Sequence, residues 1–249
     1  MTRARVPAQR ASESATPALP PLYGSPPYAY LDAWSLLIVF HTDPRVLRRI
    51  VPRPLVADPT GTMSLTVSRF FTCGFGSYHE MVLAAVAKLE GRPVNYCVQL
   101  VLDNDIALGA GREIWGFPKK LGTVTLSEHG GVVRATVDRA GGRLVDAAMA
   151  VGALGGPRDL NGSLEYVNLK LIPSVEQDRP PEVMQLTSTT LENFVLHKLV
   201  VGRGATVQFH PSPADPFHTI PVREVAGGWY YNADFDLGYG TVVHDYLAR

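Results

Sequence analysis

Residues 122–137, Gly-Thr-Val-Thr-Leu-Ser-Glu-His-Gly-Gly-Val-Val-Arg-Ala-Thr-Val, indicate the fold class of this chain. Two β-rich runs, 122–126 and 132–137, flank the turn signal Glu-His-Gly-Gly, which is typical of a hairpin. Similar runs, separated by Gly, Pro, Asn and Asp turn signals, occupy residues 35–41, 61–71, 94–102, 164–171, 194–197, 205–209 and 221–233. The pattern predicts a mainly β fold with short helices, most simply a closed or nearly closed antiparallel β-barrel.

Helical patterns are scarce. Residues 43–51 form the clearest one, with Asp43 or Thr42 as N-cap, Pro44 at the first helical position and several apolar residues on one face. We also predict short helices at 111–115, before Pro118, and at 143–153, which is rich in small residues.

Composition limits the possible organisation and partners. Residues 1–28 are rich in Pro, Ser and Ala and predict a flexible tail, followed by a single domain over residues 29–249. The 23 Lys and Arg balance the 23 Asp and Glu, so no basic surface is expected to hold a nucleic acid. No apolar stretch is long enough to span a membrane. The two cysteines, Cys73 and Cys97, form no disulfide framework, which favours a cytoplasmic location.

Residues 111–122, Gly-Arg-Glu-Ile-Trp-Gly-Phe-Pro-Lys-Lys-Leu-Gly, carry the most informative chemical signal. The lysine doublet, Lys119 and Lys120, has apolar neighbours on both sides, unlike a surface turn with two solvated lysines. Burial destabilises a protonated amine, lowers its pKa and leaves a nucleophile that attacks ketones. If both lysines lie on a strand, their side chains point to opposite faces. Burial would then lower the pKa of the reactive lysine more than repulsion between the two lysines does.

Other catalytic signatures are absent from the sequence. It contains no dinucleotide-binding or phosphate-binding glycine motif, no His-Glu-x-x-His and no Gly-x-Ser-x-Gly. The seven histidines are not spaced as metal ligands with cysteines or carboxylates. We therefore predict neither a metal nor an organic cofactor.

The segment around the doublet resembles the signature of the acetoacetate decarboxylase family, in which an Arg-Glu pair, a Pro and a Lys-Lys occur in this order. This family is itself the general example of an imine-forming lysine that is activated by desolvation or by a neighbouring cation. Further segments that resemble the family are Phe40–Asp43, Ile50–Leu55, Leu102–Asp105, Asn168–Pro173, Ile220–Val225 and His244–Leu247. The resemblance covers about residues 28–248 and implies a β-barrel around a central cavity, and a homo-oligomer.

The resemblance also implies roles for individual residues. Lys119 matches the lysine that forms the imine, Lys120 its neighbour, and Glu80 the active-site glutamate. Arg112 and Glu113 match the pair that supports the loop carrying Lys119 and Lys120, the lysine loop. We expect Trp115, Phe117, Tyr78 and Val101 to contact the substrate, a small-molecule keto acid.

Two positions depart from the family pattern. The family arginine near the active-site glutamate aligns with Ala33, and a second acidic residue aligns with Leu65. Without that arginine, we expect the Glu80 carboxyl to lack a neighbouring cation and to hold a proton near neutral pH. A substrate carboxylate would also lack a partner.

Three functions remain open on this basis. The first is decarboxylation of a β-keto acid through a lysine imine. The second keeps the imine but performs an aldol condensation and dehydration, or a cyclisation, in a biosynthetic pathway. The third is a ligand-binding barrel without turnover.

Overall fold

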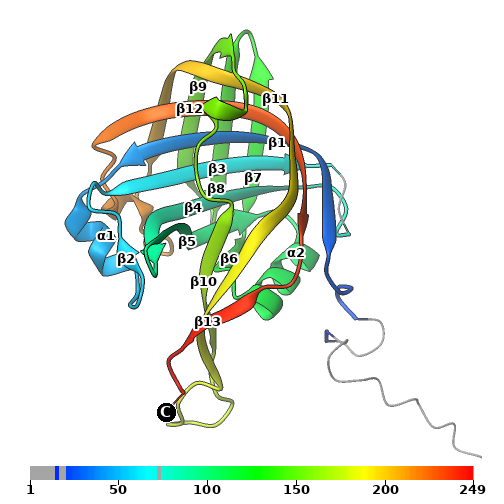
Figure 1. Ribbon diagram of the computed structural model, residues 1–249, viewed down its shortest axis with the longest axis vertical. Coiled ribbons are helices and arrows are strands. Elements are labelled where there is room, and N and C mark those ends of the chain that lie inside the picture. The colour runs from blue at the N-terminus through cyan, green and yellow to red at the C-terminus, as the bar shows by residue number, and fades with distance from the viewer. Residues whose placement is uncertain (1–14, 17–20, 72–73, 249) are drawn as a thin grey trace, which may run out of the picture.

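The computed structural model describes residues 15–16, 21–71 and 74–248. Within these ranges the strands form one thirteen-stranded sheet that curls round on itself (Figure 1). The elements in chain order are β1 (Tyr28–His41), α1 (Pro44–Ile50), β2 (Val56–Ala57), β3 (Thr62–Phe70), β4 (Tyr78–Leu89), β5 (Arg92–Leu102), α2 (Asp105–Ala110), η1 (Gly111–Trp115), β6 (Lys119–Leu121), β7 (Thr123–His129), β8 (Val132–Arg139), β9 (Gly142–Leu154), η2 (Pro157–Asp159), β10 (Glu165–Ile172), β11 (Val183–Phe209), η3 (Phe217–Thr219), β12 (Glu224–Leu237) and β13 (Thr241–Asp245). The prediction of a mainly β fold with short helices is confirmed.

Hydrogen-bonded pairing closes seven of these strands into a ring. The order around it is β10, β5, β4, β3, β1, β12 and β11, and β11 pairs again with β10. Among the described strands, β5 pairs in parallel with β10 and with β6, and the remaining pairs are antiparallel. The parallel pairing with β6 brings the lysine doublet alongside the end of β5.

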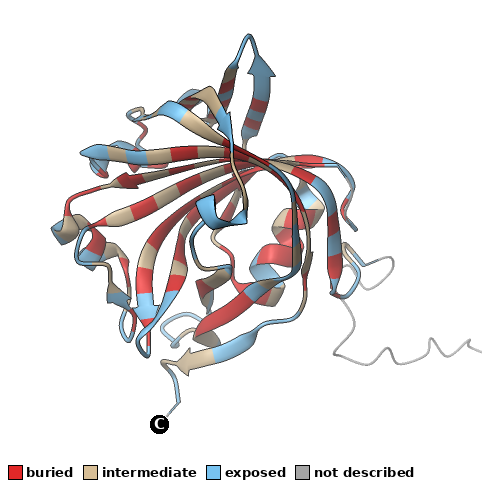
Figure 2. Ribbon diagram, turned by 45° about the horizontal axis from the view of Figure 1, so that its top comes forward, coloured by how far each residue is buried: buried red, intermediate tan, exposed pale blue. Residues whose placement is uncertain are grey.

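A second layer covers part of the outer face of the ring. The 27-residue strand β11 runs beyond the ring and pairs with β9, which continues through β8 to β7 (Figure 1). The main core contains residues of this layer, such as Val124 and Val133, together with Leu65 and Met81 from the ring. Buried and more exposed residues alternate along these strands (Figure 2) because successive side chains point to opposite faces.

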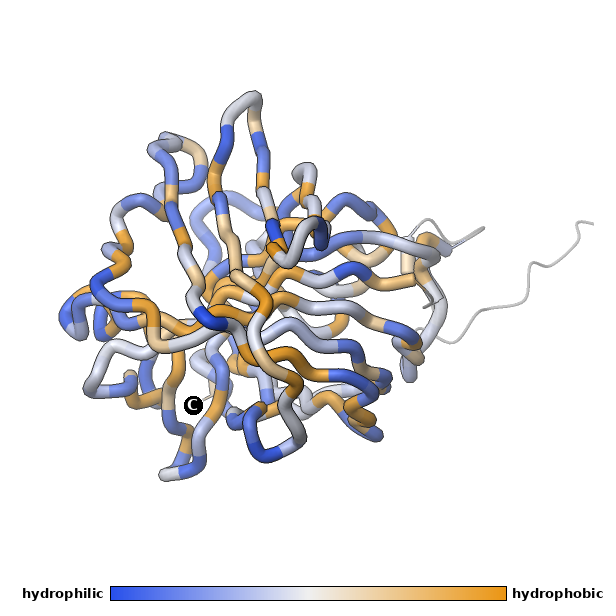
Figure 3. Tube along the Cα trace, turned by 90° about the horizontal axis from the view of Figure 1, so that it is seen from above, coloured by the Kyte–Doolittle hydropathy of each residue, from blue (hydrophilic) through white to orange (hydrophobic). Residues whose placement is uncertain are grey.

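This alternation separates the core from the interior of the ring. On β3, Met63, Leu65 and Val67 are buried in the core, whereas Ser64 and Thr66 line cavities. A second apolar cluster gathers around α2 and η1 and includes Trp115 and Phe117. The most hydrophobic segments lie toward the middle of the molecule (Figure 3). The lysine loop is therefore attached to a packed apolar cluster rather than to an exposed turn.

The three helix predictions have different outcomes. Helix α1 is confirmed, and the Asp43 side chain accepts a hydrogen bond from the Arg45 backbone nitrogen at its N-terminus. Residues 111–115 are helical but form a π-helix that continues α2, whose N-cap is Asn104. The helix predicted over residues 143–153 is wrong, because this segment is strand β9, held between β8 and β11. Its small residues fit a strand that is covered on both edges.

Other expectations fall partly outside the described residues. Of the predicted tail, residues 1–14 and 17–20 are not described, and neither is Cys73. Cys97 is buried within the second cluster. No helix within the described ranges is long and apolar enough to cross a membrane.

Candidate active site

Lys119 and Glu80 form a buried ion pair inside the ring. The Lys119 Nζ lies 2.7 Å from the Glu80 Oε2, and the two side chains are only 6% and 9% exposed. Lys119 begins β6, opposite Leu100 of β5, and Glu80 lies on β4, opposite Leu102. Neighbouring strands therefore hold the amine and the carboxylate at hydrogen-bond distance.

The π-helix leaves room for the Lys119 side chain. A Cβ atom on Gly111 would lie 2.6 Å from the Cδ and Cε atoms of Lys119, which is too close for any real contact. Gly116 ends the π-helix with a φ of 74°, and a Cβ there would lie 2.5 Å from the Lys170 Cα. Glycine is therefore required at position 116, whereas a side chain at position 111 would displace the flexible Lys119 side chain.

Arg112 supports the lysine loop directly. Its Nη1 donates a hydrogen bond of 3.1 Å to the carbonyl oxygen of Lys119. Glu113 makes a different contact, since it accepts a hydrogen bond from the Tyr23 hydroxyl. Of this predicted supporting pair, Arg112 touches the lysine loop, and Glu113 connects the π-helix to the segment before β1.

Lys120 points away from Lys119 and binds a different carboxylate. Its Nζ lies 2.6 Å from Oδ1 of Asp215, whose side chain is fully buried. Gln99 and Arg139 also donate hydrogen bonds to Asp215, of 2.6 and 2.5 Å. Burial alone would raise the pKa of the Asp215 carboxyl, but hydrogen bonds from Lys120, Gln99 and Arg139 together hold it below its ordinary value.

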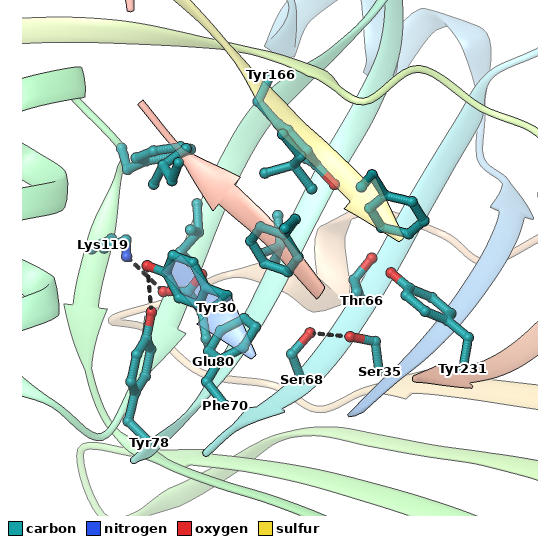
Figure 4. Close-up of a pocket in the computed structure, with 17 residues that line it drawn as sticks. Tyr30, Ser35, Thr66, Ser68, Phe70, Tyr78, Glu80, Lys119, Tyr166 and Tyr231 are labelled. Atoms are coloured by element: carbon teal, nitrogen blue, oxygen red, sulfur yellow. Dashed lines mark hydrogen bonds and ion pairs between the residues drawn. The ribbon is translucent and has the colours of Figure 1, made fainter. Parts of the chain in front are cut away.

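A small cavity of about 80 Å³ surrounds the Lys119–Glu80 pair, and we call it the lysine chamber (Figure 4). Its wall consists of hydroxyl-bearing, aromatic and aliphatic side chains from the seven strands of the ring and from the lysine loop. Besides Lys119 and Glu80 it is lined by Tyr30, Ser35, Thr66, Ser68, Phe70, Tyr78, Val82, Leu100, Phe117, Tyr166, Leu191, Phe194, Tyr231, Phe235 and Leu237.

Hydroxyl groups provide much of the polarity of the lysine chamber. The Tyr30 and Tyr78 hydroxyls lie 3.2 Å apart, and those of Ser35 and Ser68 lie 2.7 Å apart. Figure 4 shows Tyr30 and Tyr78 close to the Lys119–Glu80 pair. Burial raises the pKa of Tyr166 and Tyr231, so both phenols remain neutral hydrogen-bonding groups.

Lys119 and Glu80 are the only Lys, Arg, His, Asp or Glu side chains among the described residues that line the lysine chamber. Ala33 is buried in the second apolar cluster and supplies no charge. Leu65 points into the main core, and the residues of β3 that line the lysine chamber are Thr66, Ser68 and Phe70. Ala33 places no cation beside Glu80, and the charged partner of the Glu80 carboxylate in the chamber is Lys119.

The residues expected to contact substrate divide into two groups. Tyr78 and Phe117 line the lysine chamber, and Trp115 and Val101 do not. Val101 points into the main core because Leu100, its neighbour on β5, points into the chamber. The Trp115 indole is turned aside, and its Nε1 donates a 3.0 Å hydrogen bond to the Gly238 carbonyl oxygen.

Sequence reasoning missed the aromatic residues that β1, β10, β11 and β12 contribute. Tyr30, Tyr166, Phe194 and Tyr231 lie on four strands that are far apart in sequence. The alternation of inward-facing and outward-facing residues along each strand was the available signal. The order in which the strands pair around the ring was also needed to place these side chains together. In the described part of the chain, no group of three or more His, Cys, Asp or Glu could hold a metal ion.

The fold and the lysine chamber together define a class of protein: a mainly β protein whose ring of strands encloses a buried lysine–carboxylate pair. The sequence pattern of the acetoacetate decarboxylase (ADC) family matches residues 8–247. The chain belongs to the acetoacetate decarboxylase family, and it is therefore an acetoacetate decarboxylase-like lyase.

Individual relatives agree with this assignment. Acetoacetate decarboxylase of Ralstonia nicotianae is 32% identical over 246 residues, covering 96% of this chain and 98% of the relative. The crystal structure of acetoacetate decarboxylase from Legionella pneumophila is 26% identical, with a TM-score of 0.87 over 98% of this chain and 95% of that one. The enduracididine biosynthesis enzyme MppR complexed with pyruvate shares the fold, with a TM-score of 0.82, 18% identity and coverage of 93% and 97%.

Proposed function

We propose that the protein decarboxylates a β-keto acid through an imine on Lys119. The observation that carries this proposal is the 2.7 Å contact between a buried amine and a buried carboxylate in an enclosed chamber. A carboxylate at this distance is positioned to act as the general base that removes the ammonium proton, and the neutral amine is the nucleophile. Membership of the acetoacetate decarboxylase family supports the same reaction.

The reaction then proceeds without an external oxidant or cofactor. Lys119 attacks the ketone carbon, and loss of water gives a protonated imine. The bond to the carboxylate breaks, its electron pair flows into the imine to form an enamine, and CO₂ leaves. Glu80 gives the proton from Lys119 to the departing hydroxyl group, takes up a second proton from water and donates it to the enamine carbon. Hydrolysis then releases the ketone and the free lysine. The apolar wall of the lysine chamber favours the loss of CO₂, because it destabilises the substrate carboxylate relative to neutral CO₂.

A second candidate keeps the imine and changes the bond-forming step. The lysine chamber holds no cation besides Lys119 among its described lining residues, so a substrate carboxylate has no separate partner there. That feature favours an aldol condensation and dehydration, in which Glu80 would protonate a leaving hydroxyl.

Borohydride reduction separates these candidates. Acetoacetate and pyruvate are each incubated with the protein, the imine is reduced and the peptide mapped, and CO₂ is measured in parallel. A Lys119 adduct with CO₂ from acetoacetate supports decarboxylation. A Lys119 adduct without CO₂ supports the second candidate, and the absence of any adduct supports a binding protein without turnover. Lys119→Met must abolish the adduct, whereas Lys88→Met, at an exposed strand position, must preserve it.

A further inference from the structure

A second, larger cavity adjoins the lysine chamber. It has a volume of about 610 Å³, and we call it the distal cavity. Four side chains line both spaces: Thr66 of β3, Tyr166 of β10, Phe194 of β11 and Tyr231 of β12. In Figure 4, Thr66 and Tyr231 lie at the side of the lysine chamber away from Lys119. These four residues, the collar, mark the boundary between the two spaces.

The two volumes suit different parts of one molecule. About 80 Å³ accommodates a keto group and a few attached atoms, whereas about 610 Å³ lies within the range of sites that enclose whole small molecules. A substrate that filled the lysine chamber alone would leave the distal cavity without a role. A longer substituent on the same carbonyl compound would pass the collar and enter it.

The chemistry of the distal cavity indicates what kind of substituent it accepts. Leu37, Val39 and Val86 of the ring strands are only half buried, although they face the interior. Leu160 and Leu164, in the connection between β9 and β10, contribute apolar surface to the same wall.

The polar lining of the distal cavity is uncharged. It consists of hydroxyl groups and amides, among them Ser64 and Asn95, and the Asn95 amide donates a 2.6 Å hydrogen bond to the Ser163 carbonyl. No Lys, Arg, His, Asp or Glu is among the described residues that line it. A charged end group would therefore be desolvated there without a partner.

We propose that the distal cavity is a substrate subsite for an uncharged, mainly aliphatic or aromatic chain attached to the carbonyl group that reacts at Lys119. This inference rests on the proposed imine function and deepens it, because it names the substrate class. The substrate is a medium-chain or aryl-substituted keto acid rather than a four-carbon one. The carbonyl carbon lies at Lys119, the chain passes the collar, and its end contacts Leu37 and Val39.

A chain-length series tests the subsite. Methyl ketones from acetone to 2-nonanone are reduced onto the protein with borohydride, and the ketone concentration for half-maximal adduct is measured for each. Each buried methylene is expected to lower that concentration about threefold to fourfold, until the distal cavity is filled. Lys119→Met must give no adduct with any ketone.

Ser64→Phe provides the matched variant, because Ser64 lines the distal cavity but not the lysine chamber. It is expected to flatten the dependence on chain length. Ser127→Phe, the same change at an exposed position of β7, is expected to keep it. Ser64→Leu replaces Ser64→Phe if the larger side chain prevents folding, as judged by circular dichroism.

The outcomes distinguish the two proposals. A wild-type series that is flat or worsens with length overturns the subsite but leaves the imine function intact, since acetone still reacts. The subsite is also overturned if the Ser64 variant keeps the wild-type dependence of adduct formation on chain length. Failure of every ketone to form an adduct overturns the imine function, and the subsite with it.

Discussion

The side chain of Lys119 runs directly across Gly111, so closely that a Cβ atom there would lie 2.6 Å from the lysine Cδ and Cε. Gly111 begins the π-helix and does not adopt a positive φ; its value is −61°. The need for glycine is therefore one of space rather than of backbone conformation. The Lys119 amine can point toward Glu80 because Gly111 has no side chain in its path.

Gly111→Ala is expected to displace the Lys119 amine while leaving the fold intact. The lysine side chain is flexible and yields more easily than the packed π-helix. A displacement of about 1 Å at a reacting group costs about a hundredfold in rate. The measurement is kcat on the accepted keto acid, with circular dichroism to confirm folding. Gly142→Ala, at a position with open space around it, serves as the control, and equal rates for the two variants would contradict the account.

Lys120→Gln is expected to leave the pH dependence of adduct formation almost unchanged. The Lys120 amine is bound to Asp215, on the opposite face of β6 from the Lys119–Glu80 pair, so its charge acts only weakly on the reaction. Borohydride trapping of acetone between about pH 5 and pH 9 measures the profile. A displacement of the midpoint by about two pH units would show that repulsion between the two lysines controls the site.

Asp215→Asn is expected to destabilise the protein by about 3 kcal/mol near neutral pH, because Lys120 and Arg139 lose their buried carboxylate. The folded-state pKa of Asp215 lies below its ordinary value, so its contribution is fully present above about pH 4. It is lost as the pH falls through the folded-state pKa. Urea unfolding of the wild type and of Asp215→Asn at neutral and acidic pH measures the difference between their free energies of unfolding. This difference is expected to shrink on acidification, and a difference that grows would contradict the prediction.

Glu80→Gln is expected to slow turnover by about a hundredfold to a thousandfold, because the amide neither accepts the Lys119 proton nor returns one to the enamine. Single-turnover kinetics with rapid quenching separates imine formation from product release. Glu128→Gln, on the exposed end of β7, controls for the substitution itself. A rate within tenfold of the wild type would assign proton transfer to another group, such as the neighbouring tyrosines.

Local pattern was enough to predict most of the longer strands and α1, since alternation and an N-cap act over a few residues. It did not predict β4, the strand that carries Glu80, or the short strands β2, β6 and β13. The same reasoning failed at residues 143–153, where small residues suit a helix in isolation but pack as β9 between two neighbours. The 27-residue β11 was predicted only as two short pieces, at 194–197 and 205–209. Its length depends on partners that are distant in sequence.

The lysine doublet was identified from its apolar neighbours and Glu80 from the resemblance to the family, and the structure places Lys119 and Glu80 in contact. Val101 was expected to contact the substrate, but it points into the main core, since a strand's register cannot be read from composition alone. Asp215 was missed entirely. It lies in a connection between β11 and β12, and only the folded chain brings it under Lys120.

The central claim is that Lys119 acts as the nucleophile that forms an imine within the lysine chamber. The most direct measurement is reduction with borohydride in the presence of acetone, followed by peptide mass mapping. The account predicts an isopropyl group on Lys119, none on Lys120, and none on either residue in Lys119→Met. Modification at Lys120 instead, or an unmodified Lys119 in protein that is folded and saturated with ketone, would contradict it.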